Sequence, residues 1–255
     1  MIRQYATIAG GEVRSVSWFD RDFPLTEIRE ASDADTTLVA FVSPNNPTGS
    51  TISVDEVRAV AEDMPQAALL IDQAYAEFEN ERTQDQQLTE VALREWPHAV
   101  VVRTFSKSFG LAGLRMGYAL GQPELIDWLR RAGSPYPVAG PALEIAMEAL
   151  HGSRAARETY IAEVAQERGM LRDLLHELGI GSLPTEGNFV LADFSGAELS
   201  ADEVCGQLAS MGISIRSFSS LPTSLRITCP GDPTAFSRLC QSLRSILANV
   251  KETKS

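Results

Sequence analysis

Short apolar runs alternate with segments of helical periodicity along the first 150 residues of the chain. Each run is five residues long and is followed by polar residues, as in a strand that is buried on both faces of a parallel sheet. A helix is predicted at residues 53–64, where Ser53 and Glu56 have the spacing of a capping box. This alternation predicts an α/β fold, in which helices sandwich a mostly parallel sheet. The three predicted buried strands are residues 38–42, 67–71 and 98–102.

Weaker patterns complete the first part of the chain. Residues 1–9 have helical periodicity, and residues 12–18 alternate between polar and apolar side chains, which predicts a helix and then a strand. Further along, we expect a short returning strand and two helices, at residues 117–120, 123–131 and 141–150. These elements together predict a first domain that spans residues 1–150.

The second part of the chain has a different pattern. A long amphipathic segment comes first, and it predicts a bridging helix at residues 151–178, with an apolar stripe that serves core packing. Short strands and two helices follow, which predicts a small α+β domain at residues 179–255, with its helices on one face of a sheet. The predicted strands are residues 187–192, 213–216 and 224–229, and the predicted helices are residues 201–211 and 233–250.

Charge and cysteine content narrow the classes of function. The net charge of −12 argues against a nucleic acid or an anionic membrane as a partner. No apolar run is long enough to span a bilayer, and no signal peptide is predicted. Cys205, Cys229 and Cys240 lack the spacing of metal ligands, so no metal site is expected. They are interpreted as free thiols in a reducing cytoplasm.

The strongest chemical signal is Lys107, in a loop that follows the third buried strand. Ligands of open α/β sheets bind outside the carboxyl ends of the strands, which is where this lysine is expected. Thr104, Ser106 and Arg115 lie nearby in the sequence, and hydroxyls with an arginine are suited to a phosphate group. An amine beside a phosphate site suggests a Schiff base to pyridoxal phosphate. The alternative is a solvated surface lysine.

A second signal is Asp72, which closes the second buried strand. A carboxylate in that position is costly unless it has a partner, and the protonated nitrogen of a pyridine ring would be one. Tyr75 follows three residues later and could donate a hydrogen bond to the phenolic oxygen of the same cofactor. The alternative for Asp72 is a cap of a helix or a turn.

These residues stand in motifs that resemble a known family. The segment Ser-Lys-Ser-Phe-Gly-Leu-Ala-Gly-Leu-Arg, residues 106–115, resembles the lysine loop of fold-type I pyridoxal-phosphate aminotransferases, and most closely that of the histidinol-phosphate aminotransferase branch. Asn-Asn-Pro-Thr-Gly at residues 45–49 and Leu-Arg-Ile-Thr at residues 225–228 match further motifs of that family. The tetrapeptide at residues 72–75 differs from the family's Asp-Glu-Ala-Tyr by having Gln73.

The resemblance implies a role for each matching residue. Lys107 would form the Schiff base and move the proton, while Thr104, Ser106 and Arg115 would hold the cofactor phosphate. Asn46 would bond the phenolic oxygen, unless its loop is only a turn before a helix. Arg226, a charge in an apolar strand, would clamp the α-carboxylate of the substrate. Asn188 would lie near the substrate, or else satisfy local backbone groups.

The resemblance also implies an activity and an assembly. The expected reaction moves an amino group between an amino acid, or histidinol phosphate, and a 2-oxo acid, in a cytoplasmic homodimer. The chain would start inside the cofactor-binding domain and lack the family's N-terminal part, so that residues 1–150 form a partial large domain. Two alternatives remain open: a decarboxylase of the same fold, similar to threonine-phosphate decarboxylases, and a truncated homologue without activity.

Overall fold

The computed structural model describes residues 2–19, 22–79 and 82–252, and its chain forms two compact units. The first unit comprises residues 1–43, 51–74 and 81–147, and the second comprises residues 44–50, 75–80 and 148–255. The long segment that we expected to bridge two domains belongs to the second unit. Two short segments from the first half of the chain belong to the second unit as well, so this division differs from a cut at residue 150.

A four-stranded sheet forms the centre of the first unit. Its strands are β1 (Leu38–Val42), β2 (Ala68–Asp72), β3 (Ala99–Thr104) and β4 (Gly117–Gly121), in the order β1-β2-β3-β4. The first three strands are parallel, and β4 returns antiparallel to β3. The register sets Asp72 between Val42 and Val102, so this carboxylate lies at the carboxyl edge of the parallel strands.

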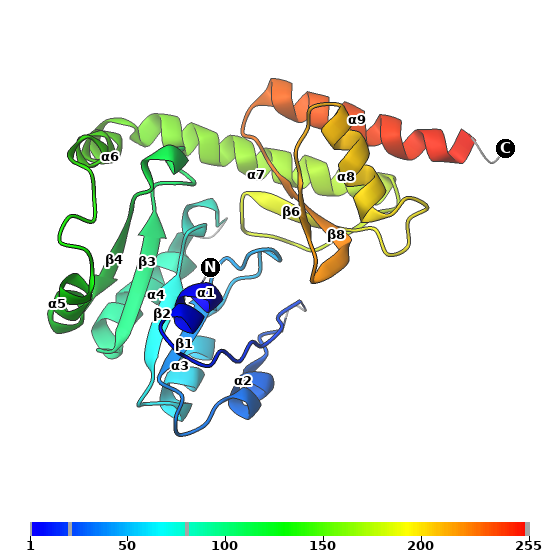
Figure 1. Cartoon of the computed structure of the whole chain (residues 1–255). Coiled ribbons are helices and arrows are strands. Elements are labelled where there is room, and N and C mark those ends of the chain that lie inside the picture. Colours follow the sequence, from blue (N-terminus) through cyan, green and yellow to red (C-terminus); the bar gives the residue numbers. More distant parts are fainter. Residues whose placement is uncertain (1, 20–21, 80–81, 253–255) are drawn as a thin grey trace. The chain divides into compact units, whose positions relative to one another are not determined.

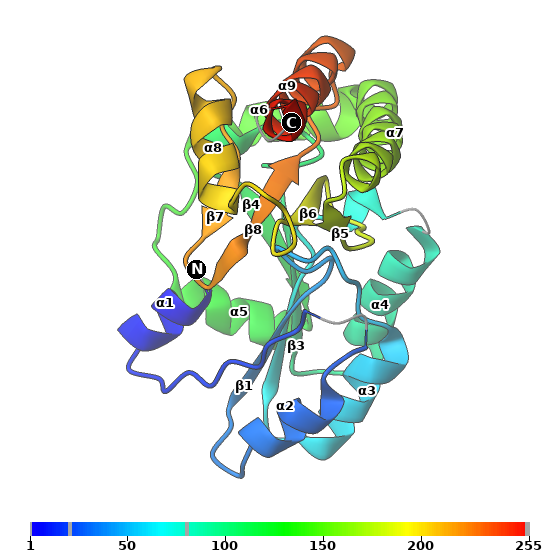
Figure 2. The ribbon, with the colours of Figure 1, turned by 90° about the vertical axis from the view of Figure 1, so that its right-hand side faces the viewer.

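Helices on both sides of this sheet make the first unit an α/β structure (Figures 1 and 2). In Figure 2, α3 and α4 lie to the right of the strands and α1 lies to the left. The predicted capping box of α3 is present, with Ser53 Oγ accepting from the Glu56 amide and Glu56 accepting from the Ser53 amide. The helices are α1 (Ile2–Ile8), α2 (Leu25–Ala31), α3 (Val54–Asp63), α4 (Arg82–Glu95), the 3₁₀-helix η2 (Ala112–Leu114), α5 (Pro123–Ala132) and α6 (Gly140–Gly152), which runs past the end of the unit.

The core of the first unit fills the space between the sheet and the helices α3 and α4. Leu69, Ile71 and Val101 alternate along the strands and are at most 1% exposed, as expected for the covered face of a sheet. Burial of this side fixes the register of β2 and β3, because a slip by one residue would turn these side chains to the other face. The carboxyl edge that carries Asp72 is therefore held in place by the core.

One prediction for the first unit is wrong. Residues 12–18 form no strand, and within the described residues they pair with no neighbouring strand. Val13, Val16 and Trp18 are its half-buried residues, and the Trp18 ring packs against Phe23 at a ring distance of 5.6 Å. An extended segment without a hydrogen-bonding partner has the side-chain period of a strand but no ladder, and the pattern alone does not separate the two.

The second unit has an antiparallel sheet with the strand order β5-β6-β8-β7. Its helices α7, α8 and α9 gather on one side of the strands, which confirms an α+β arrangement (Figures 1 and 2). The strands are β5 (Gly181–Ser182), β6 (Phe189–Asp193), β7 (Arg216–Phe218) and β8 (Leu221–Thr228). The helices are the 3₁₀-helix η1 (Ala76–Phe78), α7 (Arg154–Glu177), α8 (Ala201–Ser210) and α9 (Pro233–Glu252).

The strand predicted at residues 213–216 begins only at Arg216. Gly212 has a φ of 74°, and the Ile213 amide donates to the Leu208 carbonyl at 2.9 Å. These are the features of a glycine-terminated helix end, so Ile213 completes α8 and does not start the next strand. In the described part of the chain, no helix combines the length and the apolar character needed to cross a membrane.

Candidate cofactor and substrate site

The predicted site residues fall into two groups. Asp72, Thr104, Ser106, Lys107 and Arg115 lie in the first unit. The second unit carries the remaining four, which are Asn46, Tyr75, Asn188 and Arg226.

Asp72 ends β2 with its carboxylate half-buried, and Oδ1 accepts the Ala74 amide at 3.0 Å. Burial raises the pKa of Asp72, while the Ala74 hydrogen bond and the positive charge of Lys107 act in the opposite direction. The side chains of Asp72 and Lys107 are therefore close enough for their charges to interact. A desolvated carboxyl group with a raised pKa is suited to a further cationic partner, such as a protonated ring nitrogen.

Two backbone hydrogen bonds within the Lys107 loop constrain its conformation. The Leu111 amide donates to the Phe105 carbonyl at 2.9 Å, and the Gly110 amide donates to the Lys107 carbonyl at 3.0 Å. Gly110 has a φ of 68°, a conformation that glycine adopts without a steric penalty. Lys107 is half-buried on this loop, so its amine is presented by a constrained backbone.

The residues predicted to hold a phosphate make hydrogen bonds within their own loop. Thr104 Oγ1 donates to the Met116 carbonyl at 3.2 Å and accepts the Ser106 amide at 3.0 Å, so its proton is used inside the loop. Arg115 is exposed, has a φ of 54°, and donates to the Ala112 carbonyl at 2.9 Å. In the part of the chain that the structure describes, no hydrogen bond joins Arg115 to Ser106.

In the second unit, the structure brings Asn46 and Arg226 together. Arg226 donates from an NH group to Asn46 Oδ1 at 2.7 Å, although the two residues are 180 positions apart in the sequence. The Asn46–Pro47 peptide bond is cis, and Gly49 in the same loop has a φ of 80°. A Cβ atom at Gly49 would lie 1.8 Å from Thr185 Oγ1, so only glycine fits there.

Phe189 is the residue that connects this group, and its packing role was missed by the sequence analysis. Its ring is fully buried at the start of β6, and the Tyr75 ring packs edge-on against it at 5.2 Å. The guanidinium of Arg226 lies over the same ring at 5.0 Å from its centre. The Nε atom of Arg226 is buried and has no hydrogen-bond partner among the described residues. The available signal was its place directly after Asn188 in the strand predicted at residues 187–192.

Asn188 is 9% exposed and interacts with Tyr160 of α7. Burial raises the pKa of Tyr160, and the hydrogen bond with Asn188 opposes this effect. The side chain of Asn188 therefore has a side-chain partner on α7, whereas the more ordinary of its two interpretations expected local backbone groups. The Asn188 backbone carbonyl accepts the Cys229 amide at 2.9 Å.

Gln73 occupies the position at which the sequence departs from the family pattern. Its side chain is 1% exposed, and Oε1 accepts from Thr89 Oγ1 at 2.7 Å and from Arg103 at 3.0 Å. The residue thus belongs to a buried network that links β2, β3 and α4. The amide oxygen at this position therefore serves hydrogen bonding within that network.

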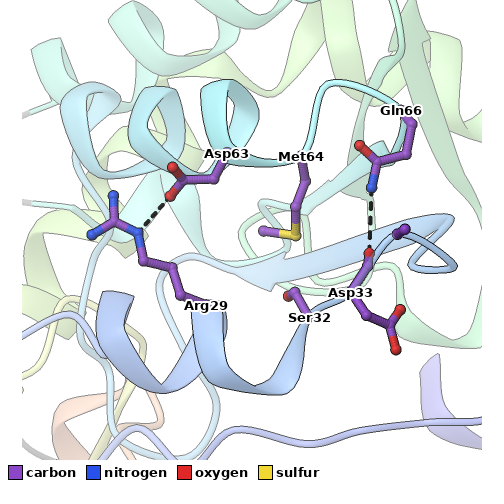
Figure 3. A pocket seen from close by; sticks show the side chains of 7 residues that line it. Arg29, Ser32, Asp33, Asp63, Met64 and Gln66 are labelled. Atoms are coloured by element: carbon purple, nitrogen blue, oxygen red, sulfur yellow. Dashed lines mark hydrogen bonds and ion pairs between the residues drawn. The ribbon is translucent and has the colours of Figure 1, made fainter.

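A pocket of about 590 Å³ lies elsewhere in the first unit, between α2 and the end of α3 (Figure 3). Arg29 and Asp63 form an ion pair of 2.6 Å at its wall, and Gln66 donates to the Asp33 carbonyl at 3.4 Å. None of the predicted site residues lines it. Arg29 and Asp63 pair with each other and Asp33 pairs with Arg14, so the charged side chains of the pocket already have partners and we assign it no role.

Comparison with known proteins agrees with the resemblance of the motifs. The model of the family "Aminotransferase class I and II" matches residues 1–243, and the chain belongs to this family. A histidinol-phosphate aminotransferase of Ruegeria sp. is 38% identical over 259 residues, which cover all of this chain and 67% of the relative. The enzyme of the same name from Anoxybacillus flavithermus is 35% identical, with 89% of this chain and 60% of the relative covered.

A solved structure is similar over the same region. The histidinol-phosphate aminotransferase of Sinorhizobium meliloti, in complex with pyridoxal-5'-phosphate, has a TM-score of 0.86 and 25% identity. The match covers 97% of this chain and 68% of that chain. The predicted fold class and the predicted cofactor of the family are confirmed. The chain thus spans between 60% and 68% of the length of these three proteins.

Proposed function

We propose that this chain carries out pyridoxal-phosphate-dependent transamination, in which an amino group moves between an amino acid, or histidinol phosphate, and a 2-oxo acid. The observation that supports this most directly is the half-buried carboxylate of Asp72, which lies at the carboxyl edge of the parallel sheet and interacts with the charge of Lys107. An acid and an amine in that position fit the two ends of a pyridoxal ring. Membership of the aminotransferase family supports the same function.

The cofactor, when bound, would draw electrons from the substrate α-carbon into its ring. Lys107 would hold it through a covalent bond from Nζ to its aldehyde carbon. The amino group of the substrate would displace Nζ from that carbon, and the freed amine would move a proton from the substrate α-carbon. Asp72 would stay ionised and accept a hydrogen bond from the protonated ring nitrogen. The constrained loop supports this role, because a fixed backbone limits the positions that the amine can take.

Further residues are proposed to orient the cofactor. Asn46 and Tyr75 would donate hydrogen bonds to its phenolic oxygen. Ser106 and Arg115 would hold its phosphate, and Arg115 has more N–H donors than its one bond to Ala112 uses. Thr104 would contribute chiefly by holding the Ser106 amide, since its own proton is directed to the Met116 carbonyl.

Two arginines of the second unit are suited to bind an anionic substrate. Arg226 would clamp the substrate carboxylate with its planar guanidinium group. Arg216 lies directly opposite Arg226 in the pairing of β7 with β8. Like charges in that position repel each other, so an anion bound beside them would relieve the repulsion. Asn188 would lie near the substrate and limit its orientation.

We further propose a homodimer in the cytoplasm. The first unit exposes large apolar side chains along α5, α6 and the segment between them, including Trp128 at 59% and Tyr136 at 89% exposure. Exposed apolar surface of this kind is typical of interfaces. All three cysteines are free, as is usual for proteins of a reducing compartment.

The dimer can be tested by sedimentation velocity on the purified chain. We expect a single species with twice the mass of the chain. The double variant Trp128→Glu with Leu143→Glu is expected to be a monomer, because charges on a buried apolar surface are costly. Sedimentation of the unaltered chain as a monomer across a range of concentrations would contradict the proposal.

The proposed function can be tested by adding pyridoxal phosphate to the purified chain. We expect imine absorbance and, after reduction with borohydride, a stable adduct. The chain has three lysines, at positions 107, 251 and 254, so peptide mass mapping can assign the adduct, which we expect on Lys107. Conversion of the cofactor to pyridoxamine phosphate by an amino donor supports transamination, whereas release of carbon dioxide would favour the decarboxylase. Absence of an adduct on Lys107 would refute both.

A further inference from the structure

Helix α7 buries two adjacent charged residues that the proposed reaction does not use. Glu167 is 3% exposed and Arg168 is 4% exposed. A charge removed from water requires hydrogen bonds to compensate its lost hydration, so the partners of such residues indicate what they hold in place. Both residues and all the partners named below belong to the second unit.

Arg168 hydrogen-bonds two separate backbone segments. One NH group donates to the Gly187 carbonyl at 2.9 Å and to the Phe78 carbonyl at 3.2 Å, and the other lies 3.4 Å from Glu186 Oε2. Phe78 ends the 3₁₀-helix η1, whose N-cap is Tyr75. Gly187 immediately precedes Asn188. A single guanidinium therefore joins the segments that carry Tyr75 and Asn188.

The contacts extend from these segments to the other two proposed site residues. Phe189 follows Asn188 and packs against both the Tyr75 ring and the Arg226 guanidinium. Arg226 in turn donates to Asn46. The loop that carries Asn46 is tied to the same segment by the Glu186 amide, which donates to the Gly49 carbonyl at 2.9 Å.

We propose that Arg168 is a positioning residue of the cofactor and substrate site. It acts on the reaction by fixing the Tyr75 and Gly187–Phe189 segments, and through Phe189 it determines where Arg226 can lie. The proposal rests on the proposed function for the roles of these side chains. The coupling of the segments to Arg168 rests on the hydrogen bonds themselves.

Glu167 provides a matched control. It is equally buried and also binds backbone groups, accepting the Gly231 amide at 2.7 Å and the Asp232 amide at 3.0 Å. These amides belong to the turn before α9, which carries none of the proposed site residues. Glu167→Gln thus removes a buried charge from the same helix while leaving the Arg168 contacts in place. The test variants are Arg168→Met, which keeps the bulk, and Arg168→Lys, which keeps the charge.

Hydrogen exchange of the purified full chain is the first readout. In Arg168→Met, the amides of residues 75–79 and 186–189 are expected to exchange about tenfold faster, because two buried carbonyls lose their donor. Arg168→Lys should give a smaller increase, since an ammonium lacks the planar fork of the guanidinium. Glu167→Gln should accelerate exchange around residues 231–232 and leave the other two segments unchanged. Equal acceleration of all three segments in both Arg168→Met and Glu167→Gln would overturn the proposal.

Kinetics on the cofactor-loaded chain is the second readout. Arg168→Met is expected to raise the KM for the amino donor about tenfold with a smaller change in kcat, because it displaces residues that bind the substrate. Arg168→Lys should recover part of this loss, and Glu167→Gln should keep the KM of the unaltered chain. A KM that is unchanged in Arg168→Met would overturn the proposal. If the unaltered chain forms no adduct with pyridoxal phosphate, the proposed function fails, while hydrogen exchange still decides the role of Arg168.

Discussion

Replacing Lys107 with alanine is expected to lower the rate of amino-group transfer about 10³-fold or more, because the variant loses both the covalent attachment and the group that moves the proton. No other lysine lies in the loop that follows β3, so the chain has no nearby substitute. The measurement is the rate of pyridoxamine phosphate formation from an amino donor, followed by its absorbance. Binding of pyridoxal phosphate should persist in weaker, dialysable form, since the other proposed contacts remain.

The double variant Lys251→Arg with Lys254→Arg is the matched control for this experiment. It leaves Lys107 as the only lysine in the chain and should keep both the adduct and the rate. Far-ultraviolet circular dichroism would show whether Lys107→Ala remains folded. A folded Lys107→Ala variant that retains the rate of the unaltered chain would refute the proposed role of Lys107.

Replacing Asp72 with asparagine is expected to lower the rate about 10²- to 10³-fold, the range found when one aligned electrostatic contact is removed from an active site. An amide at this position has no negative charge and cannot keep a ring nitrogen protonated. The adduct on Lys107 should still form, because the aldehyde and the amine are unchanged. Measurement of the adduct and of the rate in the same preparation separates these two effects. A rate within about threefold of the unaltered chain would contradict the role of Asp72.

The substitution Asp72→Asn lowers the expected rate, but it should raise the stability of the cofactor-free chain at neutral and higher pH. Burial raises the pKa of Asp72 above its ordinary value, so the folded state binds this proton more tightly than the unfolded state does. The unaltered chain therefore loses stability relative to Asp72→Asn as the pH rises from the ordinary carboxyl pKa through the raised one. Above that window, thermal unfolding should show the variant to be the more stable protein. Pyridoxal phosphate should reverse the order, because only the aspartate pairs with the ring nitrogen.

Much of the first unit can be predicted from the sequence because its signals are local. Three five-residue apolar runs give the parallel strands, and the spacing of Ser53 and Glu56 gives the start of α3. The strand predicted at residues 12–18 fails because a strand also needs a partner, which no local pattern specifies. The strand predicted at residue 213 fails because a glycine-terminated helix end uses Ile213.

In the candidate site as well, residues with a local sequence signal could be predicted, whereas contacts between residues far apart in the sequence could not. Asp72 can be found because a carboxylate at the end of an apolar strand is costly, and Lys107 because its loop follows an apolar strand at the edge of the sheet where ligands bind. The contact between Arg226 and Asn46 spans 180 positions and could be inferred only through the family resemblance. Arg168 gave no signal, because a charged residue on a long amphipathic helix is usually exposed, and its burial follows from the segments that fold around it.

The division of the chain into units limits how the molecule can be dissected. The polypeptide passes from one unit to the other five times, after residues 43, 50, 74, 80 and 147. A fragment expressed from residue 148 onward would lack the loop of Asn46 and the segment of Tyr75. In that fragment, the Phe189 ring would lose its contact with Tyr75, and the Arg226 guanidinium would lose the Asn46 amide oxygen that accepts its hydrogen bond. The C-terminal half of the sequence is therefore not an independent module.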